Sequence, residues 1–202
     1  PRRWQPNYVN GSRISMKTGL SGPPALVAGP GCALWVTAEG EVEELDYAAA
    51  LDRAAADPPL VCHRPALARR LGGAVPAAFD LLELFAFVRP ATACLPTPSG
   101  LASALGLPQP RGLAGAAAVL RAAATRLLQG LAAGADPQAA ALLPHLAAAG
   151  WAWAPAASAA LGASASGGAA KTGLAVWRRL PEWTGEAPPP PPGTAAVAPA
   201  DA

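Results

Sequence analysis

The chain is short of charge, of cysteine and of aromatic side chains, and each shortage argues against a class of protein. Only 14% of its 202 residues are charged and 5% are aromatic, and 15 Lys and Arg nearly balance 13 Asp and Glu. That balance gives no indication of a protein that coats nucleic acid by charge. Three scattered cysteines, Cys32, Cys62 and Cys94, form no CxxC pair, which argues against a zinc site and a disulfide scaffold. We therefore expect buried thiols in the reducing cytoplasm.

The sequence also lacks a membrane span and the common catalytic motifs. Residues 137–170 carry no Asp, Glu, Lys or Arg, but they are mostly alanine and are interrupted by prolines and glycines. A span needs about 20 strongly apolar residues, so we expect a pair of buried helices and no membrane partner. The motifs GxGxxG, GxSxG and HExxH do not occur. Ala170 stands where a phosphate loop needs glycine before Lys171, so this segment predicts a flexible loop.

Alanine is abundant, and the chain divides by composition. Of the 202 residues 53 are Ala, 24 are Pro and 21 are Gly, which favours helices joined by turns. We expect an irregular N-terminal extension (1–23), an α/β domain (24–110), an Ala-rich helical extension (111–163) and a flexible Gly/Ser loop that runs into a proline-rich linker (164–202). A run of prolines at 188–192 predicts a polyproline II linker, which we expect to lead to a further domain outside this sequence.

Hydrophobic periodicity and turn residues predict an α/β fold in which strands come first and helices dominate after residue 64. The pattern from Ala33 to Leu45 predicts a β-hairpin with a half-exposed second strand, and Asp46 is placed to cap the helix that follows. The apolar residues 79–88 predict a buried helix. The other expected elements are a strand over 60–62 and helices over 47–56, 65–71, 98–106, 113–131 and 137–150.

The large apolar side chains predict where the chain packs. We expect one core between the small sheet and the helices, and its expected members are Trp35, Leu60, Cys62, Phe79, Leu82 and Phe85. Trp151 and Trp153 follow a helix stop. That position favours a hydrophobic clasp between helices, with a platform for stacked bases as the alternative.

Three blocks within residues 33–107 resemble, in order and spacing, the DEDD family of 3′–5′ exonucleases. The first block matches a strand that ends in a histidine, the second an Ile-Asp-Thr-Leu-Glu-Leu motif, and the third a helix that ends in Leu-Gly-Ile. The matching residues are Val61, Cys62 and His63, then Asp80, Glu83 and Leu84, then Leu101, Leu105, Gly106 and Leu107. The resemblance implies a small, degenerate ribonuclease-H-like mixed sheet early in the chain, followed by the Ala-rich helices.

The positions that would carry metal-binding carboxylates depart from this family. Such nucleases hold two metal ions with carboxylates, and the ions activate water and stabilise the leaving oxygen. Ala68 stands at one metal-binding position, no Asp-x-Glu pair occurs in the chain, and no acid lies between His145 and Glu182, where a late one is expected. We therefore expect no catalytic residue and no metal ligand, and His63, Ala68 and Asp80 mark a degenerate site.

A degenerate exonuclease-like domain before a proline-rich linker is similar to the N-terminal region of some bacterial DinG-like ATP-dependent DNA helicases. Residues 79–90, 150–155 and 176–183 add to that resemblance. It implies a non-catalytic accessory domain of a helicase in DNA repair and unwinding, with the motor downstream in cis and DNA bound through the parent protein. The resemblance implies that this chain alone has no cofactor and no enzymatic activity. The full-length helicase, a hydrolase, is then expected to use ATP and Mg²⁺, and its downstream part is a possible site of an iron–sulfur cluster.

Arg64, Arg69 and Arg70 flank His63 and are the candidate contacts to nucleic acid, because arginine attracts phosphate where a carboxylate repels it. The alternative is a solvated helix face, since neighbouring residues on a helix point about 100° apart. Two other functions stay open on the sequence. One is an Ala-rich structural or interaction domain, and the other is a 3′–5′ exonuclease, which would need a carboxylate cluster.

Overall fold

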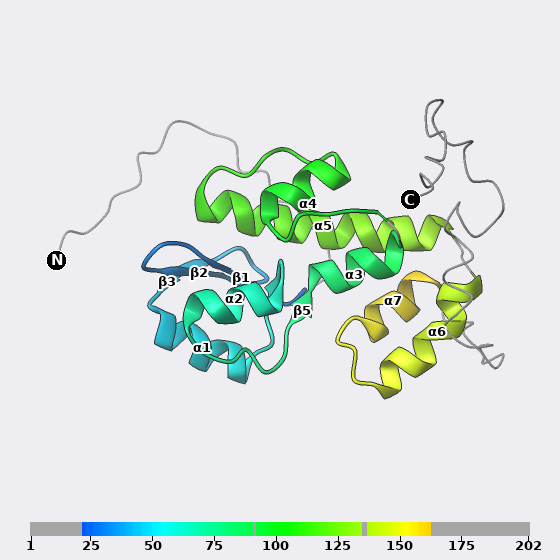
Figure 1. Ribbon diagram of the computed structural model, residues 1–202, viewed down its shortest axis with the longest axis horizontal. Helices are drawn as coiled ribbons and strands as arrows, with labels where there is room; N and C mark the ends of the chain where they lie inside the picture. The colour runs from blue at the N-terminus through cyan, green and yellow to red at the C-terminus, as the bar shows by residue number, and fades with distance from the viewer. Residues whose placement is uncertain (1–21, 91, 135–136, 163–202) are drawn as a thin grey trace, which may run out of the picture.

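The computed structural model describes residues 22–90, 92–134 and 137–162 and contains a mixed β-sheet with helices packed around it (Figure 1). The five strands of these residues have the order β3-β2-β1-β4-β5. β1 (Ala25–Ala28), β2 (Ala33–Val36) and β3 (Val42–Leu45) are antiparallel neighbours, and β4 (Leu60–Val61) and β5 (Phe79–Asp80) continue the sheet parallel to β1. The mixed sheet early in the chain, followed by helices, confirms the expected α/β class.

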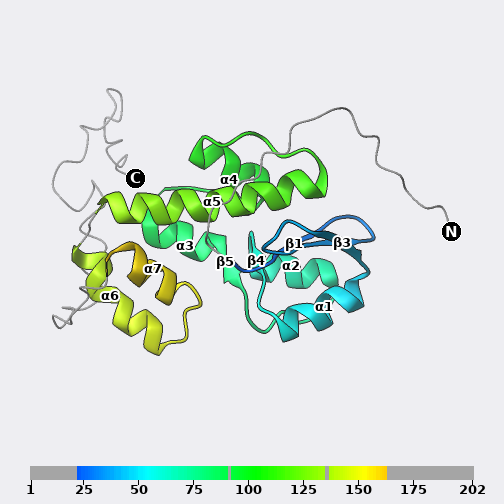
Figure 2. The same cartoon turned by 180° about the vertical axis from the view of Figure 1, so that it is seen from behind.

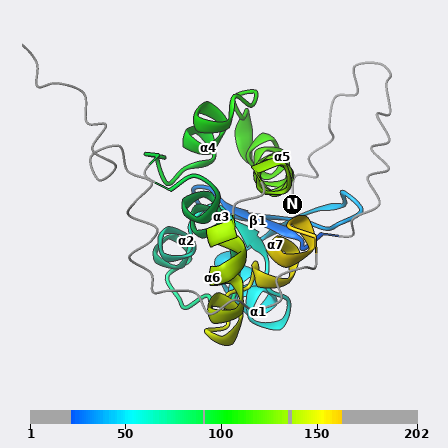
Figure 3. The same cartoon turned by 90° about the vertical axis from the view of Figure 1, so that its right-hand side faces the viewer.

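Helices cover both faces of the sheet, as the end view shows (Figure 3). α1 (Tyr47–Ala56) and α2 (Arg64–Leu71) lie on one face. α5 (Gly112–Gly134) runs along the other face together with α3 (Leu81–Val88) and α4 (Pro98–Leu105). α6 (Pro137–Ala148) and α7 (Ala154–Ala160) form a hairpin beside α3, away from the β2–β3 end of the sheet (Figure 2). The first helix of the expected extension, α5, therefore packs directly on the sheet.

Helix ends lie close to their expected positions because the capping residues make the predicted bonds. Asp46 accepts a 2.8 Å hydrogen bond from the amide of Ala49 at the start of α1. Thr97 accepts a 3.0 Å bond from the amide of Gly100 at the start of α4. Gly106 ends α4 with a φ of 65°, a left-handed conformation that glycine adopts without steric cost. These local signals confirm α1 and α4 almost to the residue.

The expected single core is wrong, because the sheet separates two cores. Alternate residues of a strand point to opposite faces of a sheet. Trp35, which is 1% exposed, packs with Leu26 against α1 and α2. Leu60 and Phe85 instead belong to the core beneath α5. The remaining three expected members, Cys62, Phe79 and Leu82, are half-buried at the edge of that second core.

Three elements differ from the expectation or were not expected. Phe79 and Asp80 form β5 and not the first turn of a helix, because the amide of Phe79 bonds the carbonyl of Pro59 at 2.8 Å and both residues pair with β4. β1 is an apolar run of four residues, buried between β2 and β4, so it lacks the alternation that reveals a half-exposed strand. α6 and α7 are the expected pair of helices within 137–170, but α7 is only seven residues long and much of α6 is exposed, so the pair is not buried as a whole.

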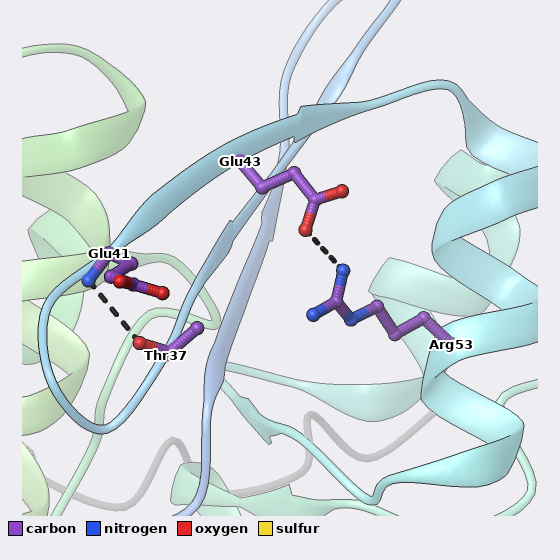
Figure 4. Close-up of polar contacts among 4 residues, drawn as sticks. All are labelled: Thr37, Glu41, Glu43 and Arg53. Atoms are coloured by element: carbon purple, nitrogen blue, oxygen red, sulfur yellow. Dashed lines mark hydrogen bonds and ion pairs between the residues drawn. The ribbon is translucent and has the colours of Figure 1, made fainter.

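Polar contacts hold the β2–β3 hairpin on α1 (Figure 4). Arg53 of α1 forms an ion pair with Glu43 of β3, and its guanidinium carbon lies 5.0 Å from the centre of the Trp35 ring. Across the turn, the amide of Glu41 donates a 3.3 Å bond to the hydroxyl of Thr37. The two contacts of Arg53 connect α1 to β2 and β3 on the face opposite α5.

Arg121 holds the same hairpin from the other face of the sheet. Its guanidinium, on α5, donates to the main-chain carbonyls of Val36 at 2.9 Å and Ala38 at 3.4 Å, and also to that of Thr37. Burial lowers the pKa of Arg121, while the nearby Glu39 carboxylate raises it. The sequence signal for this role is weak, because it is a lone charge within an apolar stretch of alanines.

No helix in the described ranges is both long and apolar enough to cross a membrane. Residues 1–21 of the N-terminal extension lie outside the described residues. So do the loop around Lys171, the block at 176–183 and the proline-rich linker.

Candidate functional site at the carboxyl ends of β4 and β5

The residues singled out by the sequence meet where two parallel strands end. β4 leads into Cys62 and His63, and β5 ends at Asp80. Carboxyl ends of parallel strands lie at the same edge of a sheet, which is the usual place for binding sites in α/β folds. α2 and α3 begin immediately after these strand ends, so the first turns of both helices face the same region.

Asp80 is the centre of this region, and both of its carboxylate oxygens are bonded to main-chain amides. One oxygen accepts from the amide of Leu82 at 2.9 Å and thereby caps α3. The other accepts from the amide of Arg64, the first residue of α2, at 2.7 Å. The side chain is buried, with 2% of its surface exposed. Two helix N-termini and two charge-assisted bonds therefore stabilise one buried carboxylate.

Two tryptophans attach the α6–α7 hairpin to this region. The indole Nε1 of Trp153 donates a 2.7 Å hydrogen bond to the carbonyl of Asp80, and its ring meets Phe79 edge to face at 5.2 Å. The Nε1 of Trp151 donates a 3.1 Å bond to the Glu83 carboxylate, and its ring lies 5.0 Å from that of Phe87. These contacts confirm the expected hydrophobic clasp. The base-stacking alternative is wrong for Trp153, because its ring is buried within the protein.

The surroundings of Cys62 and Glu83 favour the protonated, neutral forms of both side chains. Burial, followed by the charges of Asp80 and Cys94, raises the pKa of the Cys62 thiol to about 12. This thiol is therefore not a nucleophile at neutral pH. Burial and then Asp80 raise the pKa of the Glu83 carboxyl, while the Trp151 hydrogen bond, Arg64 and His63 lower it to a smaller extent.

His63 stands at the N-cap of α2 without a side-chain cap bond. Its main-chain carbonyl accepts from the amide of Leu67 at 3.0 Å, but its buried Nδ1 atom has no hydrogen-bond partner among the described residues. No group of three His, Cys, Asp or Glu side chains in that part of the chain is arranged to hold a metal ion.

Apolar residues occupy the positions at which the resemblance to the nucleases implies metal-binding acids. Ala68 packs against the core that contains Trp35, between α1, α2 and the sheet. An acid at this position would be placed against apolar side chains. β1, the strand next to β4, consists of Ala25–Ala28 and supplies no carboxylate. Of the three markers, His63 and Asp80 therefore lie near one another at the strand ends, whereas Ala68 belongs to a core.

The three candidate arginines do not form one cluster. Arg64 directs its guanidinium to the carbonyls of Val75 and Pro76, at 3.4 and 3.5 Å. Arg69 and Arg70 are exposed in the last turn of α2, where cations interact favourably with the helix dipole. A separation of five residues turns a helix by about 140°, so Arg64 and Arg69 point in different directions.

The sequence blocks did not predict the contacts that complete this region. Trp153 and Asp80 are 73 residues apart, and Trp151 and Glu83 are 68 residues apart. The only signal was the placement of both tryptophans after a helix stop.

Comparison with protein-family models, with curated proteins and with solved structures gave no match.

Proposed function

We propose that this chain is a non-catalytic accessory domain of an ATP-dependent DNA helicase of the DinG-like kind, built on a degenerate exonuclease fold. The order of the three sequence blocks supports the proposal, and so does their position on the fold. The first block ends β4, the second spans β5 and α3, and the third ends α4. A mixed sheet with helices on both faces agrees with the ribonuclease-H-like architecture that the resemblance implies.

The hydrogen bonds of the Asp80 carboxylate are the main observation in favour of a domain without catalytic activity. A carboxylate that ligates a metal must offer its oxygens to the ion. Here both oxygens accept from the amides of Arg64 and Leu82, which begin α2 and α3. A carboxylate oxygen can accept a hydrogen bond and ligate an ion at the same time, but this side chain is only 2% exposed and both oxygens already bond to main-chain amides, which leaves little of it open to an ion. This bonding supports a structural role for Asp80.

Within this proposal, the chemistry belongs to the parent protein. The parent's motor domain lies downstream in cis, uses ATP and Mg²⁺, binds the DNA and operates in the cytoplasm, and an iron–sulfur cluster would also belong to that part. The coding sequence that follows Ala202 is therefore expected to encode a Walker A motif, Gly-x-x-x-x-Gly-Lys-Ser/Thr. A downstream sequence without any ATPase motif would contradict the helicase part of the proposal.

A nuclease assay tests the non-catalytic part. End-labelled single-stranded DNA is incubated with the purified chain and Mg²⁺ or Mn²⁺, beside a mock preparation and the Asp80→Asn variant. We expect no degradation above the mock preparation with either protein. Metal-dependent degradation that disappears in Asp80→Asn would show an active site and favour the exonuclease alternative.

A binding assay tests whether the arginines of α2 contact DNA. Fluorescence anisotropy with single-stranded DNA at low salt compares the wild type with Arg64→Glu/Arg69→Glu, and with Arg111→Glu/Arg126→Glu as a control of equal charge change. Lower affinity only in the first variant would support a DNA contact at α2, weak and strongly salt-dependent with so few cations. Equal affinities of the two variants would mean that these arginines solvate the helix.

A further inference from the structure

The α6–α7 hairpin is attached to the rest of the molecule by two tryptophans and a small core. Trp153 is 3% exposed and enters the core beneath α5, where it bonds the carbonyl of Asp80. Trp151 bonds Glu83 in the first turn of α3. The small core has four buried side chains, which are Leu131 of α5, Ala139 and Leu143 of α6, and Ala157 of α7. Few large side chains therefore hold the hairpin in place.

Neither helix of the hairpin is strong by itself. Pro144 lies inside α6, and proline has no amide that could bond the carbonyl of Ala140 four residues earlier. α7 has seven residues, and isolated helices shorter than about 12 residues are marginal in water. Both helices therefore depend on the contacts of the tryptophans and of the small core. If these contacts are lost, α6 and α7 loosen together.

The body of the molecule, which is the sheet with α1 to α5, is held far more strongly. α5 has 23 residues, seven of them buried, and it packs along the sheet in the large core. Burial of apolar surface stabilises in proportion to its area, so α5 separates from the sheet only when the whole body unfolds. Proteins open locally in cooperative units whose free energies of opening lie below that of global unfolding. The α6–α7 hairpin has the features of such a unit.

The hairpin covers the carboxyl end of β5, the outermost strand on this side of the described sheet. The ring of Trp153 meets Phe79 edge to face, and its Nε1 atom bonds the main-chain carbonyl of Asp80. The carboxylate of Asp80, in contrast, bonds the amides of Arg64 and Leu82 at the starts of α2 and α3. Departure of Trp153 would therefore leave both helix caps of the body in place.

We propose that the α6–α7 hairpin is a lid over the carboxyl end of β5, which opens as one unit while the body stays folded. The open state uncovers the rings of Phe79 and Phe87 and the carbonyl of Asp80. Closed and open states thus differ in access to one side of the candidate functional site. The inference goes beyond the helicase proposal and does not depend on it, because it follows from the contacts of the hairpin.

Amide hydrogen exchange in the full chain, at urea concentrations below the unfolding transition, tests the lid. Leu143 in α6 and Ala157 in α7 report on the hairpin, and Leu120 and Leu127 in α5 report on the body. We expect Leu143 and Ala157 to share one free energy of opening and one dependence on urea. Their exchange, corrected for intrinsic rates, should be at least about tenfold faster than that of the α5 amides, which corresponds to about 1.4 kcal/mol.

Two variants distinguish the lid from the body. Trp153→Phe removes the hydrogen bond to β5 and weakens the closed lid, so exchange at Leu143 and Ala157 should become about tenfold faster. Leu26→Val is the control, because Leu26 is buried in the core beneath α1 and α2 on the other face of the sheet. That core stays closed when the lid opens. The control should therefore speed exchange in α5 and leave exchange in the lid unchanged.

Equal free energies of opening in α5, α6 and α7 of the wild type would overturn the proposal, and so would equal acceleration of all four amides in Leu26→Val. Exchange at Leu143 and Ala157 that is independent of urea would also overturn it, because it would indicate fraying of single turns and not the opening of a unit. None of these results bears on the helicase proposal, which the coding sequence after Ala202 tests separately.

Discussion

The indole of Trp153 donates a 2.7 Å hydrogen bond to the main-chain carbonyl of Asp80, which joins α7 to the end of β5. The same Asp80 uses its carboxylate to hold the first amides of α2 and α3. One residue thus connects two helix starts, a strand end and the α6–α7 hairpin. The proposed function depends on this structural use of Asp80.

Trp153→Phe is expected to destabilise the protein by about 1–3 kcal/mol, because the ring still fills much of its site but the buried carbonyl of Asp80 loses a donor. Trp151→Phe is the matched control, since it removes the bond to the exposed Glu83 and should cost less. Urea unfolding monitored by circular dichroism measures both. A larger loss of unfolding free energy in Trp151→Phe than in Trp153→Phe would contradict the claim that the Trp153–Asp80 bond contributes more to stability.

Asp80→Asn should lower the free energy of unfolding by about 1–3 kcal/mol, because the amide oxygen can replace only one of two carboxylate acceptors. Either α2 or α3 then begins with an unpaired amide. The control is Asp52→Asn, because the side chain of Asp52 is exposed on the surface of α1, and it should change the free energy of unfolding by no more than about 0.5 kcal/mol. The midpoint of urea unfolding gives both values, and an unchanged midpoint for Asp80→Asn would refute the double cap.

Glu83→Gln is expected to stabilise the protein at neutral pH and to have little effect in acid. Glu83 is still exposed in part, but the fold raises the pKa of its carboxyl from the ordinary value of 4.5, first because the protein removes some of the surrounding water, so folding favours the protonated form. Its contribution to stability is fully present below the ordinary pKa and is lost as the pH rises through the folded-state pKa. Glutamine keeps an acceptor for Trp151 and carries no charge.

Urea unfolding of wild type and Glu83→Gln at pH 7 and pH 4 measures this difference. The variant should be the more stable protein at pH 7, and the gap should narrow at pH 4. A gap of the same size at both values of pH would show that burial of the carboxylate has no energetic consequence.

Gly100→Ala should destabilise α4, because a Cβ atom there would lie 2.4 Å from the carbonyl oxygen and 2.6 Å from the Cβ of Leu95. The main chain of Leu95 cannot yield as a flexible side chain can. Gly130→Ala on α5 is the control, since its nearest neighbour would be Val88 at 3.9 Å. Alanine is favoured over glycine in a helix by about 0.5–1 kcal/mol, so this control should raise the melting temperature while Gly100→Ala lowers it.

Much of the local structure was predictable because its causes lie within a few residues of one another. Asp46 and Thr97 cap helices through amides three residues away. Gly72 and Gly106 end helices in left-handed conformations that favour glycine. The strand pair at 33–45 followed from alternation and a turn. Such signals need no knowledge of the rest of the chain.

The candidate site was predictable only in part. The sequence placed His63 after a strand but Asp80 in a helix, and the structure shows that Asp80 ends a second strand beside the first. That Asp80 bonds Arg64 across 16 residues, and Trp153 across 73, depends on how α2, α3 and α7 pack. The same holds for Ala68, whose place in the Trp35 core depends on the face of the sheet that α2 covers.

The sequence by itself determined the α/β class, the helix starts and stops, and the lack of any Asp-x-Glu pair, because each depends on residue type and near neighbours. Only the tertiary structure decided that a single sheet divides two cores, and that β3 and β5 are its outermost strands among the described residues. It also decided that the Asp80 carboxylate is held by two helix N-termini. The physical reason is that hydrogen bonds and apolar contacts between distant residues form only when packing brings their elements together, and no local pattern encodes that geometry.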